Sequence, residues 1–183
     1  QMVESVAADF GGLSILVNNA GIASRGQSVA DTDPADMERV MRVHAFAPHY
    51  MSKCALPHLR KHARSDIVMI SSVAGKAGVP MRTAYCAAKH GLIGYADALR
   101  VETAALGLQV HVITPGSIKT DVSRNAIVAD GSRRGISDPA IEKGLDPDHA
   151  VKLMLKAMAR GDREVLIARG VERTISRLRR LSP

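Results

Sequence analysis

Short apolar runs alternate with longer stretches of helical periodicity along this 183-residue chain. The short runs, rich in the residues typical of strands, lie at residues 15–17, 67–70, 110–113 and 164–167. In the longer stretches, 34–61, 83–106 and 147–160, apolar residues recur at the spacing that places them on one side of a helix. Regular alternation of strands and helices predicts a parallel sheet covered by helices.

Capping residues mark the ends of two of these helices. Asp33 precedes Pro34, and Asp146 precedes Pro147, so each aspartate can accept a hydrogen bond from the first turn while the proline supplies a fitting φ. Gly161 is the predicted stop of the second helix. We expect apolar faces at Val40, Val43, Ala47, Met51 and Cys54 in the first helix, and at Val151, Leu155 and Met158 in the second.

Composition is typical of one globular domain spanning residues 1–183, since 46% of the residues are hydrophobic. A net charge of +7 raises the question of nucleic acid, yet there is no Trp and only 3% of residues are aromatic. We therefore expect no nucleic-acid role. Cys54 and Cys86 are far apart, which favours inert thiols in a reducing cytoplasm. No apolar run reaches about 18 residues, the length that spans a membrane.

The C-terminal segment, about residues 170–181, is predicted to be a basic amphipathic helix. Its apolar residues, at spacings of four, three and three, are Val171, Ile175, Leu178 and Leu181. Such a face ordinarily packs on its own domain or on a partner subunit. Contact with a membrane surface is the alternative.

Candidate chemistry begins with Tyr85 and Lys89, which are four residues apart in a predicted helix and therefore share a face. A lysine ammonium beside a phenol favours the phenolate, so we expect Lys89 to lower the pKa of Tyr85. Ser72 ends the strand-like run thirteen residues earlier. By contrast, His58 and His62 lack a third metal ligand, so no metal site is predicted and both rings are expected to face solvent.

These residues occur together with Asn18-Asn19-Ala20-Gly21 after the first strand, and with Pro115-Gly116 and Thr120 after the third. In this combination the chain resembles the short-chain dehydrogenases/reductases almost end to end. Within that family it looks most like the hydroxysteroid-dehydrogenase-like reductases, judging from Asp130-Gly131-Ser132, Lys143-Gly144-Leu145 and Arg163–Ile167. The resemblance implies a three-layer Rossmann-type, doubly wound parallel sheet.

The resemblance also implies a function, namely NAD(P)-dependent interconversion of a ketone or aldehyde and an alcohol. Tyr85 would be the general acid/base, Ser72 would bind the substrate oxygen, and Lys89 would hold the nicotinamide ribose. The implied cofactor contacts, with NADP slightly favoured over NAD, are Asn19, Ala20, Gly21, Tyr85, Lys89, Pro115, Gly116, Ile118 and Thr120. The long irregular stretch at about 117–144 would fold over the site, since loops of that length are usually functional or mobile.

His44 departs from the family pattern, because it stands where the family usually carries a catalytic asparagine. In the family the backbone of that residue binds a water molecule in a proton relay, and the His44 carbonyl can do the same. Ser14 also departs, since an aspartate is common there. His44, together with the lack of a glycine-rich turn in this sequence, leaves an alternative open, in which the chain is a catalytically silent binding or assembly module.

Family members begin with a strand, a glycine-rich turn and a helix that receives the cofactor pyrophosphate. Residues 1–10 instead read as the end of a helix that Gly11-Gly12 stops. We therefore expect a βαβαβ portion of about 70 residues to precede this chain in a longer enzyme, and we expect these residues alone to be inactive. The family also implies a small-molecule carbonyl or alcohol substrate and a homodimer or homotetramer.

Overall fold

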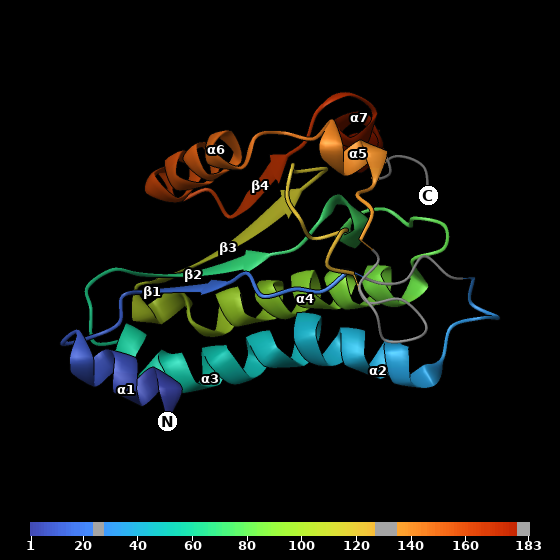
Figure 1. Ribbon diagram of the computed structural model, residues 1–183. Coiled ribbons are helices and arrows are strands. Elements are labelled where there is room, and N and C mark those ends of the chain that lie inside the picture. Colours follow the sequence, from blue (N-terminus) through green and yellow to red (C-terminus); the bar gives the residue numbers. More distant parts are fainter. Residues whose placement is uncertain (24–27, 127–134, 179–183) are drawn as a thin grey trace.

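A computed structural model describes residues 1–23, 28–126 and 135–178 of the chain (Figure 1). Its centre is a parallel sheet in the order β1-β2-β3-β4. The strands are β1 (Ile15–Asn18), β2 (Ser65–Ile70), β3 (Leu108–Pro115) and β4 (Glu164–Ile167). All four strands predicted from the sequence are present, and the predicted α/β fold with a parallel sheet is confirmed.

Helices cover both faces of this sheet and make it the middle of three layers (Figure 1). One outer layer contains α1 (Met2–Asp9), α2 (Pro34–Met41), α3 (Ala47–Leu59) and α4 (Thr83–Glu102). The other contains α6 (Pro147–Arg160), with the short α5 (Pro139–Glu142) and α7 (Gly170–Leu178) beyond the carboxyl ends of the strands. The predicted three-layer arrangement is therefore confirmed.

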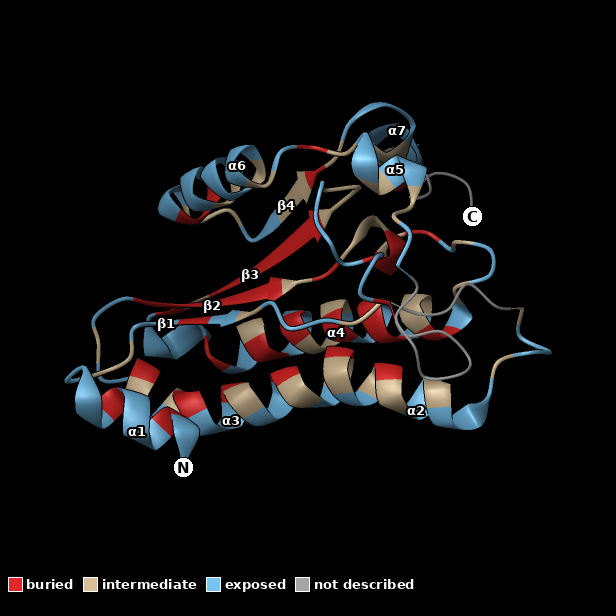
Figure 2. Ribbon diagram, in the orientation of Figure 1, coloured by how far each residue is buried: buried red, intermediate tan, exposed pale blue. Residues whose placement is uncertain are grey.

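The central strands β2 and β3 are buried on both faces (Figure 2). On one face Ile67, Met69 and Val112 pack with α3 and α4, and on the other Val68 and Ile113 pack with Met158 of α6 and with Leu145. Because side chains alternate across a strand, consecutive residues of β2 supply both cores.

The predicted caps are present where the sequence placed them. Asp33 accepts a hydrogen bond from Ala35 N at 2.8 Å, and Asp146 accepts one from His149 N at 2.9 Å. Gly161 ends α6 with a φ of 79°, in the left-handed region that glycine adopts without a Cβ clash. These local signals hold because the groups involved lie within one turn of each other.

The buried face of the α2–α3 helix differs from the prediction. Cys54 is exposed, and the buried positions are Val40, His44, Pro48, Ser52, Ala55 and Leu59. A π-helical turn, Arg42–Phe46, separates the two helices and contains one residue more than the spacing of an α-helix assumes. This extra residue rotates everything after it, so the predicted positions Val43, Ala47 and Met51 move to the edge of the buried face.

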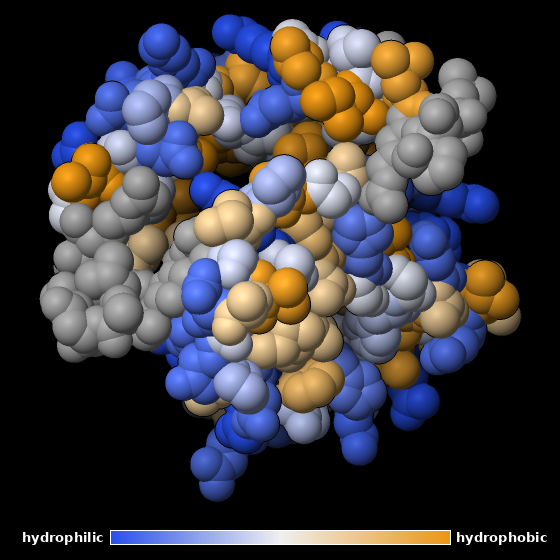
Figure 3. Space-filling view, turned by 90° about the vertical axis from the view of Figure 1, so that its right-hand side faces the viewer, coloured by the Kyte–Doolittle hydropathy of each residue, from blue (hydrophilic) through white to orange (hydrophobic). Residues whose placement is uncertain are grey.

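Two further faces are exposed where burial was predicted. In α6, Val151 and Leu155 are exposed and only Met158 of the predicted face is buried. Met158 packs with Ile167 of β4 and with Ile113 of β3. In α7, Val171, Ile175 and Leu178 are all exposed. The prediction that this apolar face packs on its own domain is therefore wrong. Leu181 lies outside the described residues. Apolar side chains gather on the surface beside the grey C-terminal residues at the upper right of Figure 3.

His58 is another correction, because its side chain is only 13% exposed. It lies 3.1 Å from the carboxylate of Glu4, where α1 packs against α3. The contact brings together residues that are far apart in sequence, which explains why a solvent-facing ring was predicted.

Strand β1 has one neighbour, β2, among the described strands. Leu16 faces α3 and is buried, whereas Ile15 and Val17 on the other face are 48% and 46% exposed. No described helix covers β1 on that side. The preceding βαβαβ portion inferred from the sequence would add strands at this edge, and it stays a prediction.

Core packing on β2 gives a direct test of the fold. Ile67 is fully buried against α3 and α4, so Ile67→Ala is expected to lower the free energy of unfolding by about 2–5 kcal/mol. Val101→Ala, at a position of α4 that is 79% exposed, should change it by less than about 0.5 kcal/mol. Urea unfolding followed by circular dichroism measures both; equal effects would contradict this core.

Candidate active site

The carboxyl ends of the strands surround a cavity of about 340 Å³. Ser72 follows β2, Tyr85 lies in the first turn of α4, and both line the cavity. Figure 3 looks onto this edge of the sheet and shows the surface hollowed between the upper and lower layers. Ligands of open parallel sheets bind at this edge, so the fold brings the sequence-predicted serine and tyrosine to a suitable place.

Lys89 lies beneath Tyr85 on α4, as their spacing predicted. Its Nζ is 5.6 Å from the centre of the Tyr85 ring and donates a hydrogen bond of 2.7 Å to the Ile70 carbonyl. Burial lowers the pKa of Lys89 to about 8. The ammonium therefore contacts the ring face and the end of β2 in this structure, and its contact with a ribose stays a prediction.

The pKa of Tyr85 is raised above its usual value, where the sequence predicted a lowered one. Burial of the phenol is the main cause, and it outweighs the lowering by a hydrogen bond with Ser72 and by the charge of Arg82. Lys89, whose Nζ lies over the ring at 5.6 Å from its centre, is not among the causes of this shift. The cation that favours the phenolate is thus Arg82, a residue that sequence reasoning missed.

Ser72 has a structural role in addition to the chemical one that the resemblance implies. Its Oγ accepts a hydrogen bond of 3.2 Å from Ala74 N and so caps the short 3-10 turn Val73–Gly75. It also lies close enough to Tyr85 to lower the pKa of that phenol. The cap fixes the hydroxyl beside the phenol, so the structural role supports the chemical one.

Ser71, the preceding residue, fastens α4 to the sheet. Its Oγ donates a hydrogen bond of 3.1 Å to the Lys89 carbonyl and is buried. Gly75 permits this approach, because a Cβ there would lie 2.5 Å from Ser71 Oγ and 2.8 Å from the Lys89 carbonyl oxygen. No role for Ser71 was predicted from the sequence. The one signal in the sequence is its position next to Ser72.

His44 lies in the π-helical turn with its side chain buried against Tyr85. Pro48, four residues later, has no N–H and cannot donate the usual α-helical hydrogen bond to the His44 carbonyl. This is the carbonyl for which the family resemblance implies a water contact. The water contact of this carbonyl stays a prediction.

The predicted cofactor contacts divide into two groups. Gly116, Ile118 and Thr120 line the 340 Å³ cavity with Ser72 and Tyr85, while Pro115 ends β3 beside it. On the other side, Asn19, Ala20 and Gly21 are exposed after β1, and Gly21 lines a second cavity of about 260 Å³. The contact of these residues with a cofactor stays a prediction, and Ser14 is exposed before β1.

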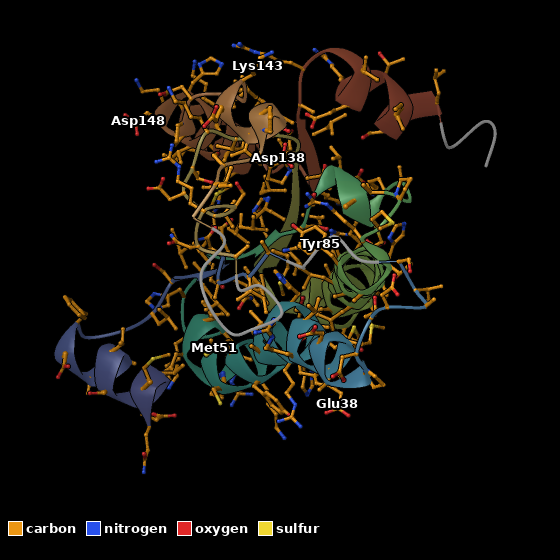
Figure 4. All side chains as sticks on the ribbon, turned by 45° about the vertical axis from the view of Figure 1, so that its right-hand side comes forward. Glu38, Met51, Tyr85, Asp138, Lys143 and Asp148 are labelled. Atoms are coloured by element: carbon orange, nitrogen blue, oxygen red, sulfur yellow. The ribbon has the colours of Figure 1, made fainter. Side chains whose placement is uncertain are left out.

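Three charged residues that the sequence did not single out line the cavity. Arg82 and Asp138 form an ion pair of 3.4 Å between the start of α4 and the start of α5. In Figure 4, Asp138 lies above Tyr85 on the opposite side of the site. Glu172 of α7 accepts hydrogen bonds from the backbone N–H and the hydroxyl of Ser117, at 3.0 and 2.7 Å.

The predicted covering segment, about 117–144, is partly described. Its described residues contain α5 and a parallel bridge between Ile118 and Leu145, and Ala140 and Ile141 line the cavity. The motif Asp130-Gly131-Ser132 lies outside the described residues. Within residues 1–23, 28–126 and 135–178 there is no cluster of three metal-binding side chains, and no helix is long and apolar enough to cross a membrane.

A family model described as short chain dehydrogenase matches residues 1–130. The chain belongs to the short-chain dehydrogenases. Among curated members, it is 37% identical over 174 residues to dehydrogenase/reductase SDR family member 7B of Bos taurus, covering 95% of this chain and 53% of that protein. It is 38% identical over 181 residues to dehydrogenase/reductase SDR family protein 7-like of Anopheles gambiae, covering 99% and 57%.

Solved short-chain dehydrogenases share the fold at lower identity. One from Streptomyces avermitilis has a TM-score of 0.81 at 23% identity, over 98% of this chain and 68% of that one. One from Burkholderia cenocepacia, in complex with NADP, has a TM-score of 0.80 at 23% identity, over 98% and 69%. The chain spans about half the length of the curated short-chain dehydrogenases it matches.

The depressed pKa of Lys89 makes stability depend on pH. An unfolded chain keeps this proton up to about 10.5, whereas the folded chain releases it near 8, so stability rises with pH within that window. Relative to Lys89→Met, the wild type should gain about 3 kcal/mol between pH 8 and 10.5. Denaturant unfolding of both proteins across this pH range measures the difference between their free energies of unfolding, from which the contributions of the other titrating groups cancel. A difference that does not change with pH would contradict the lowered pKa of Lys89.

Proposed function

We propose that the protein is an NAD(P)-dependent oxidoreductase that interconverts a ketone or aldehyde and an alcohol. The observation that carries this proposal is the placement of Ser72 and Tyr85 on one cavity, with Lys89 beneath the Tyr85 ring. A carbonyl reduction needs a proton donor within hydrogen-bond reach of the carbonyl oxygen. Tyr85 has the hydroxyl for this, and Ser72 lines the same cavity.

The nicotinamide cofactor, when bound, supplies or accepts the hydride. The chain's own residues bind and orient the substrate, and they move the proton. Tyr85 gives its proton to the carbonyl oxygen and takes it back in the oxidation direction, while Ser72 donates a hydrogen bond to the oxygen as charge develops. The elevated pKa of Tyr85 keeps it protonated at neutral pH, which suits reduction. Lys89 and the His44 carbonyl are the next groups along the proposed proton relay.

Cofactor binding is proposed on the same residues. Asn19, Ala20 and Gly21 offer exposed backbone on one side, and Ile118 and Thr120 line the cavity on the other. Solved short-chain dehydrogenases of the same fold carry NADP, NADPH or NAD in their complexes. These complexes support a dinucleotide, and NADP is slightly favoured by the resemblance.

Substrate class follows from the cavity wall. Most of the lining side chains are apolar, including Ile22, Val73, Val79, Val122 and Ile141, with Arg82 and Asp138 paired across it. A lipophilic ketone or secondary alcohol therefore fits best. The alternative of a silent binding or assembly module has less support, because the catalytic groups are assembled rather than dispersed.

Assembly into a homodimer or homotetramer is proposed through the outer helices. Phe46 and Tyr50, one turn apart, are 49% and 62% exposed, and Val101 of α4 is 79% exposed. Large apolar side chains exposed on neighbouring helices support a contact between copies.

Removing the Tyr85 hydroxyl tests the proposed reaction. Tyr85→Phe, in the protein at its full natural length, is expected to lower kcat for lipophilic ketones at least about 100-fold, because the proton donor is lost. The loss of reduced-nicotinamide absorbance measures the rate. NADPH and NADH affinities, followed by fluorescence titration, should change little.

Tyr50→Phe is the matched control and should keep the wild-type rate, since Tyr50 is exposed on α3 away from the cavity. Residues 1–183 alone should bind neither NADPH nor NADH, because this sequence has no glycine-rich turn between a strand and a helix. An absence of binding in the full-length protein would refute the oxidoreductase proposal.

Arg82 is expected to set the pH dependence of the same step. Its charge lowers the pKa of Tyr85, so Arg82→Met should move the acidic limb of the kcat profile for alcohol oxidation to higher pH. Arg124→Met removes a comparable cation, paired with Glu142 at 3.7 Å outside this cavity, and should leave the limb in place. Equal shifts of the acidic limb in both variants would show that the net charge of the protein, and not Arg82 in particular, sets the pKa of Tyr85.

A further inference from the structure

His44 occupies the point where three elements of the site meet. Its side chain is 2% exposed within the π-helical turn between α2 and α3. The imidazole lies edge-to-face against the Tyr85 ring, with centres 5.2 Å apart and planes at 87°. This geometry is favourable for two aromatic rings and limits the directions in which the Tyr85 ring can tilt.

The opposite end of the imidazole is fixed to the backbone after β1. Nε2 lies 2.8 Å from the Ile22 carbonyl oxygen and 3.2 Å from Ile22 N, so one hydrogen bond forms in either tautomer. Ile22 lines the 340 Å³ cavity together with Tyr85. One ring therefore links the proposed proton donor to the wall of the cavity that contains it.

Gly21 makes the space for this ring. A Cβ on residue 21 would lie 2.9 Å from His44 Cε1, closer than real Cβ contacts occur. A side chain at position 21 would therefore require the His44 ring to shift, in addition to the closeness to a cofactor that the family resemblance implies. The two residues form a matched pair.

The ring is neutral at physiological pH. Burial, followed by the nearby charge of Lys89, lowers the pKa of His44 to about 4. Nδ1 is buried with no hydrogen-bond partner in the described part of the chain. Packing against Tyr85 and one bond to Ile22 therefore hold the ring, and a neutral ring can lie near the Lys89 ammonium without repulsion.

We propose that the His44 side chain is a positioning residue for Tyr85. The imidazole packs against the Tyr85 ring on one side and binds the Ile22 backbone on the other, in a space that Gly21 leaves open. This inference rests on the proposed function for its catalytic consequence. It differs from the backbone role that the family resemblance implies, because it assigns the work to the imidazole. Sequence reasoning noted the histidine but not this contact.

The catalytic test compares two substitutions in the full-length protein. His44→Ala removes the ring and should lower kcat about 10- to 100-fold, the effect of misplacing a reacting group by about 1 Å. KM for the ketone and the affinity for NADPH should change less than about threefold, because the other residues that line the cavity are unchanged. His44→Phe restores a ring without the Ile22 bond and should recover most of the lost kcat.

The pairing with Gly21 gives a second measurement. Gly21→Ala should lower the melting temperature in the wild-type background, where the new methyl meets the ring, and much less in the His44→Ala background, where it does not. Equal losses of melting temperature in both backgrounds would contradict the dependence of the His44 ring on Gly21.

A readout that needs no turnover separates this inference from the proposed function. In tyrosine-labelled protein the NMR signals of the Tyr85 ring, assigned with Tyr85→Phe, should shift and show faster ring flipping in His44→Ala. Unchanged signals would overturn the positioning role whatever the activity. If these signals change and the wild type reduces no carbonyl compound, the positioning role stands and the oxidoreductase proposal fails.

Discussion

Two hydrogen bonds fasten α4 to the end of β2, and the geometry of the whole site depends on them. Ser71 Oγ donates to the Lys89 carbonyl, and Lys89 Nζ donates to the Ile70 carbonyl. The first bond is buried and the second is partly buried, and leaving a buried polar group unpaired costs about 1–3 kcal/mol. Because the pair joins the helix to the strand just before Ser72, it sets how far Tyr85 lies from the serine that shares its cavity.

The same fastening places the lysine where its charge is costly. Burial lowers the pKa of Lys89 and raises that of Tyr85, so both groups are displaced toward their neutral forms. Displacements of this kind favour proton exchange and are common at active sites. Stability at neutral pH is reduced by the buried ammonium.

The remaining walls of the site come from segments that are distant in sequence. The loop after β1 approaches Tyr85 through Gly21 and His44, α5 approaches through Asp138 and Arg82, and α7 approaches through Glu172 and Ser117. Each approach uses a polar or charged group at the end of a helix or strand. The apolar faces of α6 and α7, by contrast, remain exposed in this chain and take no part in forming the cavity.

The sequence by itself determined the strands, the caps at Asp33 and Asp146, the stop at Gly161, and the shared face of Tyr85 and Lys89. These follow from groups within a few residues of each other, whose geometry is fixed by one helical turn or one strand. Only the tertiary structure decided the π-helical turn that rotates Cys54 to the surface, the raised pKa of Tyr85, and the places of Arg82, Asp138 and Glu172. Burial, electrostatics and contacts between distant segments arise when elements pack, and no local spacing encodes them.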